Sequence, residues 1–535
     1  MARDAGQRVT KRGEAGAWLA GAADAVAAHY AVVLWAVAAL TLVYLIALPP
    51  GADVITGLTW ADLEALQGHF PTSLSDLWLS RGIGYKAFLY LAEGLARFIA
   101  GDALRLRVYI FNAIFIALAL GILVAAYRAF LARSDEDAVQ RLSLRDRAET
   151  LALAALCVVP AAIWSWAQDT HVSVLLCVLG IGLVLSPSVR AQWCSGIVLA
   201  LLFSIKGVTA LDFLFVLAAA FATGDAARIR RVIVSAGVAT AATGLAYVTI
   251  LRGELDTMLL AAQFQEHNLL LPLGVFVDNG LQFAAYNPAI PIALLALAGA
   301  IAAGAARQSP RLVGFAFLIW LAPLASLFAQ HEFFGYHYQG LVLSAWLCLT
   351  ALYLARGGQW PDFFTLRTAP PAAKAFVVLV CCVDAAQMGA ALLTTGRSIY
   401  SRPAIERRLD CWIEIARQAR PLIRTADPNL AQSGAIVNLT PVGYGLGLRS
   451  FSRFFFPLPL QPQNLGTPAG QDYVRSIVQY DGPAIIAYDA MMKLGGPYAP
   501  IVTHLRADYR PVPVTPPRCT GVQNSNVLVW LRAKR

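Results

Sequence analysis

Long apolar stretches recur along most of the chain, separated by short polar loops. Most are close to the roughly 20 apolar residues that a transmembrane helix needs, and the two around Lys206 are shorter. This pattern predicts a mainly α-helical, polytopic transmembrane bundle with about eleven spans. The apolar segments lie near 30–48, 107–127, 149–167, 172–187, 191–205, 208–222, 232–251, 288–306, 312–329, 338–355 and 375–393.

Basic residues mark alternate loops of this pattern. Arg190, Arg228 and Arg307 stand in loops on one side, whereas the opposite loops at 168–171, 252–287 and 330–337 contain only Arg252. Because cytoplasmic loops are enriched in Lys and Arg, the asymmetry predicts a cytoplasmic N-terminus. An odd number of spans then places the C-terminus outside. Residues 1–28 are basic and precede a first span without a cleavage pattern, so we expect no cleaved signal peptide.

The composition changes after about residue 394. Strand-like runs at 435–440, 483–488 and 526–531 alternate with helix-like stretches at 402–424, 470–479 and 499–506. This alternation is typical of a small α/β unit with a partly parallel sheet. Two domains are therefore predicted: a transmembrane domain over 1–393, with a long first external loop at 49–105, and an external α/β domain over 394–535.

Composition supports a membrane protein and argues against nucleic-acid binding. Of the 535 residues, 58% are hydrophobic and 14% are charged, which is too apolar for a soluble protein of this length. The net charge of +10 comes from arginines beside membrane segments. The positive-inside rule and anionic lipids explain such arginines without a nucleic-acid partner.

The eight cysteines divide into two groups. Six lie in apolar segments without metal-ligand spacing and are interpreted as small core residues. Cys411 and Cys519 alone lie in the polar C-terminal part, and a disulfide between them is open because their separation is not fixed by sequence.

The first external loop contains two candidate catalytic carboxylates, Asp53 and Asp62. A carboxylate that stays ionised near neutral pH can take a proton from an acceptor hydroxyl during attack on an activated carbon. Within the same loop, residues 86–100 are amphipathic, with Lys86 and Glu93 on a polar side, and are predicted to lie in the membrane interface.

Further polar residues gather in the other external loops. Gln168–His171 is predicted to form a tight turn between two spans, in which Asp169 and His171 position a substrate or bind a metal together with another loop. The string 331–338 holds histidines and a glutamate among aromatics, groups that are costly near a bilayer unless they line a wet cavity. The candidate substrate-binding residues of these two loops and of 252–287 are Asp169, His171, Glu266, His267, His331, Glu332, Tyr336 and His337.

Three cations complete the candidate site. Lys206 lies between two short apolar segments and is expected to extend outward, and Arg449 and Arg453 are external cations that could neutralise a lipid phosphate. No nucleotide-binding loop, serine-nucleophile elbow or metal motif is found in the sequence, so no cofactor is assigned and a requirement for a divalent metal is open. An external site has no access to cytosolic nucleotide sugars, which favours an activated lipid donor.

The layout resembles the glycosyltransferase C superfamily, the polyprenyl-phosphate-sugar-dependent membrane enzymes of bacteria. An acidic residue soon after the first span is similar to the superfamily's catalytic loop, and Phe334–Tyr338 is similar to its aromatic-histidine stretch before a late span. The tail, with Tyr444–Arg449 and Arg453–Leu460, resembles the C-terminal domain of many such enzymes. In that superfamily the acidic residue is often doubled or followed by tyrosine, whereas Asp53 and Asp62 stand apart, so both remain candidates for the base.

The resemblance implies transfer of a sugar from a polyprenyl-phosphate donor to an extracytoplasmic lipid, glycan or protein acceptor, with inversion at the anomeric carbon. The expected location is the bacterial inner membrane, with the active site on its periplasmic face. The alternative is a transporter or flippase for lipid-linked substrates, which would place polar residues at mid-membrane. A third hypothesis, a scaffold that recruits envelope partners through its tail, leaves the histidine-rich loop unexplained.

Overall fold

The structure is a computed structural model of the full chain. It describes residues 29–48, 54–55, 57–58, 61, 82–131, 143–158, 166–252, 255, 273–330, 335–358, 365–393, 402–428, 433–435, 446, 449–450, 466–488, 498–520 and 527–533.

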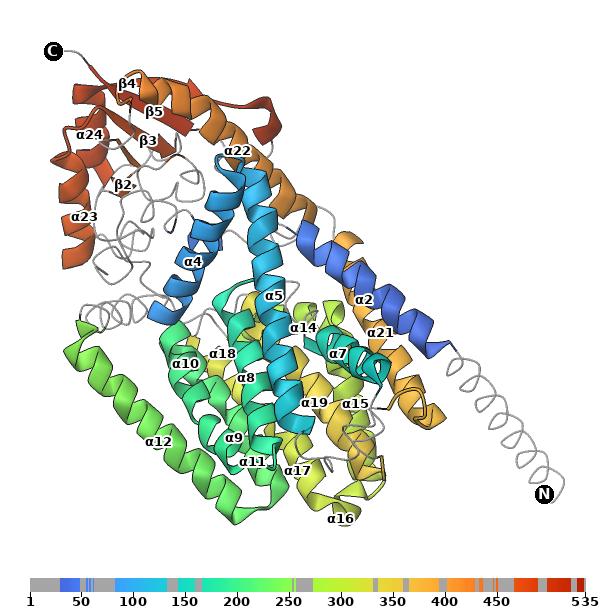
Figure 1. Ribbon diagram of the computed structural model, residues 1–535. Coiled ribbons are helices and arrows are strands. Elements are labelled where there is room, and N and C mark those ends of the chain that lie inside the picture. Colours follow the sequence, from blue (N-terminus) through green and yellow to red (C-terminus); the bar gives the residue numbers. More distant parts are fainter. Residues whose placement is uncertain are drawn as a thin grey trace.

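Apolar helices form the larger part of the molecule (Figure 1). Four helical runs are long and apolar enough to cross a membrane, and a pair bent by 95° could form a fifth span. The four are α5 (Leu104–Leu131), α12 (Ala226–Thr249), α17 with α18 (Pro310–Leu318 and Leu321–Gln330) and α21 (Pro371–Leu393), and the bent pair is α14 (Leu273–Tyr286) with α15 (Ala289–Ala302).

Shorter helices complete the described part of this bundle. The apolar ones are α2 (Tyr30–Ala47), α8 (Asp169–Leu185), α9 (Val189–Cys194), α10 (Ile197–Ile205), η3 (Gly207–Phe213), α11 (Leu214–Thr223) and α19 (Gln339–Ala355). The others are α4 (Ile83–Ala100), α7 (Leu144–Val158), α16 (Ala305–Gln308) and the short η4 (Gly335–Tyr338). About eleven spans, the number predicted from the sequence, would require several of the shorter helices to cross the membrane as well. The number of spans therefore stays a prediction.

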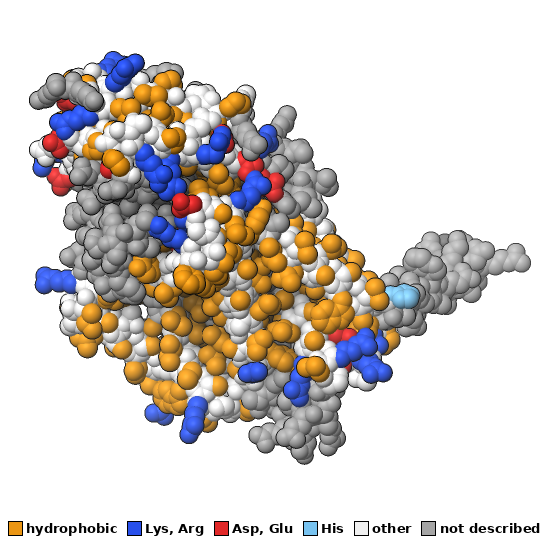
Figure 2. Space-filling view, turned by 45° about the horizontal axis from the view of Figure 1, so that its top comes forward, with side chains coloured by type: hydrophobic (Ala, Val, Ile, Leu, Met, Phe, Trp, Pro, Cys, Tyr) orange, Lys and Arg blue, Asp and Glu red, His pale blue; other side chains and the backbone are white. Residues whose placement is uncertain are grey.

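Large apolar side chains cover the outside of the bundle as well as its core. On α12, for example, Val238, Leu245 and Val248 are each more than half exposed. Figure 2 shows hydrophobic side chains spread over the middle of the molecule, with Lys and Arg gathered beyond this region at both ends. A soluble monomer rarely exposes so much contiguous apolar surface, and a helix that faces lipid does.

A smaller C-terminal unit is built around a mixed sheet. The strand order is β2-β1-β3-β5-β4, in which β1 pairs parallel with β2 and β3 while β5 pairs antiparallel with β3 and β4. The strands are β1 (Gly434–Ala435), β2 (Arg449–Ser450), β3 (Ala484–Tyr488), β4 (Tyr509–Val514) and β5 (Val527–Arg532). The helical elements are α22 (Arg402–Arg424), α23 (Pro468–Val478), α24 (Ala499–Asp508) and η9 (Pro517–Cys519).

The sheet includes two strands that the sequence did not predict, the short β2 and the longer β4. β4 contains Pro511 and Pro513, and proline cannot donate a hydrogen bond to a neighbouring strand. The strand order places β4 at the edge of the sheet, paired only with β5. An edge strand tolerates proline because one side of its backbone needs no partner strand.

Helix α22 connects the two parts. Leu409 belongs to the hydrophobic cluster of the bundle, whereas Cys411 and Ile415 belong to the separate cluster of the C-terminal unit. Cys411 is joined to Cys519 by a disulfide, with Cα atoms 4.9 Å apart, so the pairing left open by the sequence is present. This bond ties α22 to the segment between β4 and β5.

We expect loss of the disulfide to destabilise the C-terminal unit by about 2–5 kcal/mol. The two cysteines are 108 residues apart in the sequence, so the bond closes a long loop and restricts the unfolded chain. Thermal unfolding of the Cys411→Ser/Cys519→Ser variant measures this loss. Cys382→Ser, which removes an exposed free cysteine, is the matched control. An unchanged unfolding temperature in the double variant, with and without reductant, would contradict the expectation.

Candidate functional site

The start of α8 is fixed by a short turn held by two other helices. The Tyr85 hydroxyl on α4 donates a hydrogen bond of 2.6 Å to the Ala167 carbonyl oxygen. On the other side, the Trp166 indole N–H donates to the Asn112 side-chain oxygen at 2.7 Å, and Asn112 in turn donates to the Leu48 carbonyl oxygen at 2.7 Å. These bonds lock α8 against α4, α5 and the end of α2.

Ala167 has a left-handed backbone conformation, with φ of 60°. A residue with a Cβ atom adopts this conformation at a cost of about 1–3 kcal/mol, and such strain clusters at functional sites. The turn therefore holds an unfavourable backbone conformation directly before the residues 168–171.

Asp169 and His171 lie in the first turn of α8 and point into the protein. The sequence placed them in an exposed turn, but both side chains are fully buried. The His171 ring packs against Phe115 and Trp166, with ring centroids 4.8 and 5.4 Å apart. Neither ring nitrogen of His171 has a hydrogen-bond partner within the described ranges, which is uncommon for a buried imidazole.

Lys206 forms an ion pair with Asp169. Its Nζ atom lies 3.8 Å from Asp169 Oδ2, and the two side chains are 6% and 0% exposed. The prediction that Lys206 extends outward is therefore wrong. Lys206 is the residue between α10 and η3, and its ammonium group turns inward because a buried carboxylate is available there.

Two glycines let α4 approach the residues just before Lys206. The Gly82 N–H donates to the Ile205 carbonyl oxygen at 2.6 Å. A Cβ atom on Gly82 would lie 2.2 Å from the Ser204 carbonyl oxygen, and one on Gly84 would lie 2.4 Å from Ser204 Oγ. The close contact requires glycine at both positions.

A second carboxylate, which was not among the candidate residues of the sequence analysis, joins this pair. Asp212 on η3 accepts a hydrogen bond from the Ser173 hydroxyl, and the Ser326 hydroxyl of α18 also bonds to it. It interacts electrostatically with Asp169 and Lys206. A carboxylate in an apolar segment is a signal of function in membrane proteins, and that signal could have included Asp212 among the candidates.

His337 lies on a short helix that packs against α18. It belongs to η4, which packs against α14, α18 and α19, and its side chain is buried. The next residue, Tyr338, donates a hydrogen bond of 2.8 Å to the Phe276 carbonyl oxygen on α14. Helix α18 also packs against η3 and supplies Ser326, so η3 and η4 share this helix.

The structure thus brings Asp169, His171, Lys206 and Asp212 together, which we call the buried charge cluster. The cluster lies at the end of α8 that faces the C-terminal unit (Figure 1). Phe115 of α5 contacts His171 at this end of α8. The start of α5 reaches α22 through an ion pair between Arg105 and Asp410.

Other predicted site residues lie outside the described residues or are described only by their backbone. Tyr336 is placed in η4 and Arg449 in β2, each without its side chain. Outside the described residues are Asp53, Asp62, Glu266, His267, His331, Glu332 and Arg453.

The side of α4 that carries Lys86 and Glu93 faces the interior of the protein. Lys86 and Glu93 are fully buried, and Glu93 pairs with Arg107 at 3.1 Å. For Glu93 the physical reason is Arg107 of α5, a buried partner for this carboxylate, and the apolar side of α4 is left exposed.

No group of three or more His, Cys, Asp or Glu residues suited to a metal ion occurs within the described part of the chain. Comparison of the chain with protein-family models and with curated proteins finds no match.

Proposed function

We propose that this protein is a polytopic membrane glycosyltransferase that moves a sugar from a polyprenyl-phosphate donor to an extracytoplasmic acceptor. The observation that carries the proposal is the buried charge cluster at one end of an apolar helix bundle, beside the C-terminal unit. Charged groups within such a bundle are costly and are kept where they serve a site.

We further propose a bacterial inner-membrane location with eleven spans, a cytoplasmic N-terminus and the cluster on the periplasmic side. The disulfide between Cys411 and Cys519 supports an oxidising compartment for the C-terminal unit. The other end of α8 lies about 25 Å from Asp169, at a rise of 1.5 Å per residue. The next helix, α9, begins there and has Arg190 in its first turn. Arginine at that end agrees with a cytoplasmic side.

In the proposed reaction, Asp62 or Asp53 accepts the proton of the acceptor hydroxyl. The hydroxyl oxygen forms a bond to the anomeric carbon as the bond from that carbon to the phosphate oxygen breaks, and polyprenyl phosphate leaves. Inversion at the anomeric carbon is expected for this single displacement. The acceptor is a lipid, glycan or protein.

The cations of the site would offset the negative charge that develops on the leaving phosphate. His331, His337, Arg449 and Arg453 are assigned to this role together with Lys206. Asp169 and His171 position the acceptor or the donor sugar, and Glu266, His267, Glu332 and Tyr336 are assigned to substrate binding.

We expect Lys206→Met to lower the rate of sugar transfer about tenfold to a hundredfold, the effect of one charge-assisted hydrogen bond. Lys206→Arg keeps the charge and is expected to retain most activity. Transfer rates of the two variants, at equal amounts of folded protein, measure the difference. Equal rates for Lys206→Met and the unmodified protein would exclude a role for this cation.

A transporter or flippase of lipid-linked substrates is the second candidate. The bent pair α14 and α15 favours it, because broken helices build the binding sites of many transporters. Lys206, however, lies at the tip between α10 and η3 and not at mid-helix, which favours chemistry at one membrane face.

Purified protein in proteoliposomes distinguishes the two functions. With a polyprenyl-phosphate sugar and an acceptor extract, we expect sugar transfer without net movement of the donor across the bilayer. Movement of the donor without transfer would make the protein a transporter.

A reporter fused after Leu460 is expected to be active only outside the cytoplasm, and activity inside would overturn the proposed orientation.

A further inference from the structure

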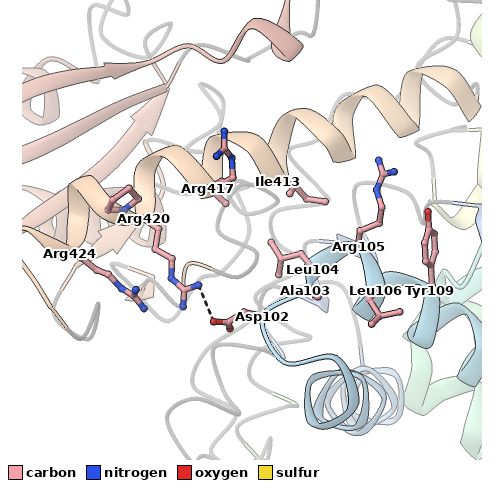
Figure 3. Close-up of a pocket in the computed structure, with 12 residues that line it drawn as sticks. Asp102, Ala103, Leu104, Arg105, Leu106, Tyr109, Ile413, Arg417, Arg420 and Arg424 are labelled. Carbon is pink, nitrogen blue, oxygen red and sulfur yellow. Dashed lines mark hydrogen bonds and ion pairs between the residues drawn. The ribbon is translucent and has the colours of Figure 1, made fainter.

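A cavity of about 710 Å³ lies between the start of α5 and helix α22 (Figure 3). Its volume is in the range of small-molecule binding sites. Four arginines line it, together with one acidic residue, Asp102, and apolar side chains such as Leu104 and Ile413. Those arginines are Arg105 from α5 and Arg417, Arg420 and Arg424 from α22.

Three of these arginines already have carboxylate partners. Arg105 pairs with Asp410, Arg420 pairs with Asp102 at 3.3 Å, and Arg417 pairs with Glu414 at 2.6 Å. Each guanidinium group has five N–H donors, so an ion pair leaves donors for a further anion.

Two donors stand out as unused. No ion pair of Arg424 is formed with the described residues, and its side chain lies on the same side of α22 as that of Arg420 (Figure 3). The Nε atom of Arg420 is buried without a hydrogen-bond partner in the described part of the chain. An unpaired buried N–H is costly, and an anion bound beside it would remove that cost.

The depth of the cavity matches that of lipid headgroups. Asn112 of α5 bonds to the Leu48 carbonyl oxygen at the end of the apolar helix α2. Arg105 lies seven residues before Asn112, about 10 Å farther along the helix axis. Helix α5 itself qualifies as a membrane span of 27 residues from Leu104 onward. Such a helix is about 40 Å long, the thickness of the hydrocarbon core with its two headgroup layers, so Arg105 near its start lies at headgroup depth.

An apolar stripe on α4 leads up to the same level. Leu91, Leu95, Phe98 and Ile99 follow helical spacing and are between 48% and 87% exposed. The polar residues of α4 face inward, as described above. An outward apolar face that ends beside arginines is the pattern expected of a helix in contact with a lipid surface.

We propose that this arginine cavity binds the phosphate headgroup of an anionic glycerophospholipid of the surrounding membrane. The phosphate bridges Arg420 and Arg424 of α22 to the start of α5, and so holds the C-terminal unit against the hairpin of α4 and α5. The buried charge cluster lies elsewhere: Phe115, which contacts His171, is ten residues beyond Arg105, about 15 Å along α5. The inference does not depend on sugar transfer.

Native mass spectrometry of the full chain, released from nanodiscs of phosphatidylglycerol and phosphatidylcholine, tests the proposal. We expect the protein to retain phosphatidylglycerol in preference to phosphatidylcholine. Arg424→Gln is expected to lower that retention about tenfold, the effect of one lost charge-assisted hydrogen bond. Arg475→Gln removes an exposed arginine from α23, away from the cavity, and is expected to leave retention unchanged.

Three outcomes would overturn the proposal. The first is equal retention of phosphatidylglycerol and phosphatidylcholine, and the second is a loss of phosphatidylglycerol retention in Arg475→Gln as large as that in Arg424→Gln. The third is displacement of phosphatidylglycerol by added polyprenyl phosphate in the unmodified protein but not in Arg424→Gln. The last result would assign the cavity to a prenyl-linked substrate. Arg420→Gln also breaks the ion pair with Asp102, so Arg424→Gln is the deciding variant.

Discussion

Asp62→Asn is expected to lower the rate of sugar transfer by about 100- to 10,000-fold, the usual contribution of a general base. If Asp62→Asn leaves the rate unchanged, the same loss is expected for Asp53→Asn. Asparagine has nearly the same shape as aspartate but cannot accept the proton of the attacking hydroxyl, so folding should be preserved in both variants.

Four described residues of the chain between these two positions are buried. Val54 directly follows Asp53 and Ala61 directly precedes Asp62, and both of these neighbours are fully buried in the hydrophobic cluster of the bundle. Ile55 and Leu58 are buried with them. These four residues are therefore part of the bundle core.

The measurement is the initial rate of transfer from a polyprenyl-phosphate sugar, with unfolding temperature as the check on folding. Asp472→Asn, in the C-terminal unit, removes an exposed carboxylate and serves as the control. Unchanged rates in both Asp53→Asn and Asp62→Asn would show that neither residue is the base.

Glu93→Ala is expected to destabilise the protein by about 3–5 kcal/mol. Glu93 and Arg107 are 0% and 1% exposed and pair at 3.1 Å, so the substitution leaves a buried guanidinium without this carboxylate. Arg107 also interacts with Asp102 at 3.6 Å, but Asp102 is 68% exposed and screened by solvent.

Thermal unfolding in detergent measures this loss. Asp102→Asn is the control and is expected to change the stability by at most about 1 kcal/mol. The double variant Glu93→Ala/Arg107→Met removes both charges and should be more stable than Glu93→Ala alone. If the double variant is less stable than Glu93→Ala, the penalty does not come from an unpaired buried charge.

The local sequence predicted many elements closely. The apolar runs at 107–127, 232–251 and 375–393 correspond to α5, α12 and α21, and the run at 526–531 corresponds to β5 within one residue. Such runs are readable because burial in lipid or in a sheet core imposes a continuous apolar requirement on neighbouring residues. β4 escaped prediction because its edge position, which makes proline acceptable, is a property of the whole sheet.

The candidate site was only partly predictable. Asp169, His171 and Lys206 were selected as polar residues at the ends of apolar segments, but their inward direction depends on packing against Phe115, Trp166 and α4. The partnership of Asp212 with Ser173 was likewise not accessible from spacing, because these residues lie on different helices.

The sequence by itself determined that this is a helical protein with membrane-spanning potential and an α/β C-terminal part, because hydrophobic runs and their periodicity are local properties. Only the tertiary structure decided which side of α4 faces outward, which charges are buried together, and that Arg105 shares a cavity with Arg420 and Arg424, some 300 residues away. These features depend on contacts between distant segments, and no local pattern specifies which partner a charged side chain will meet.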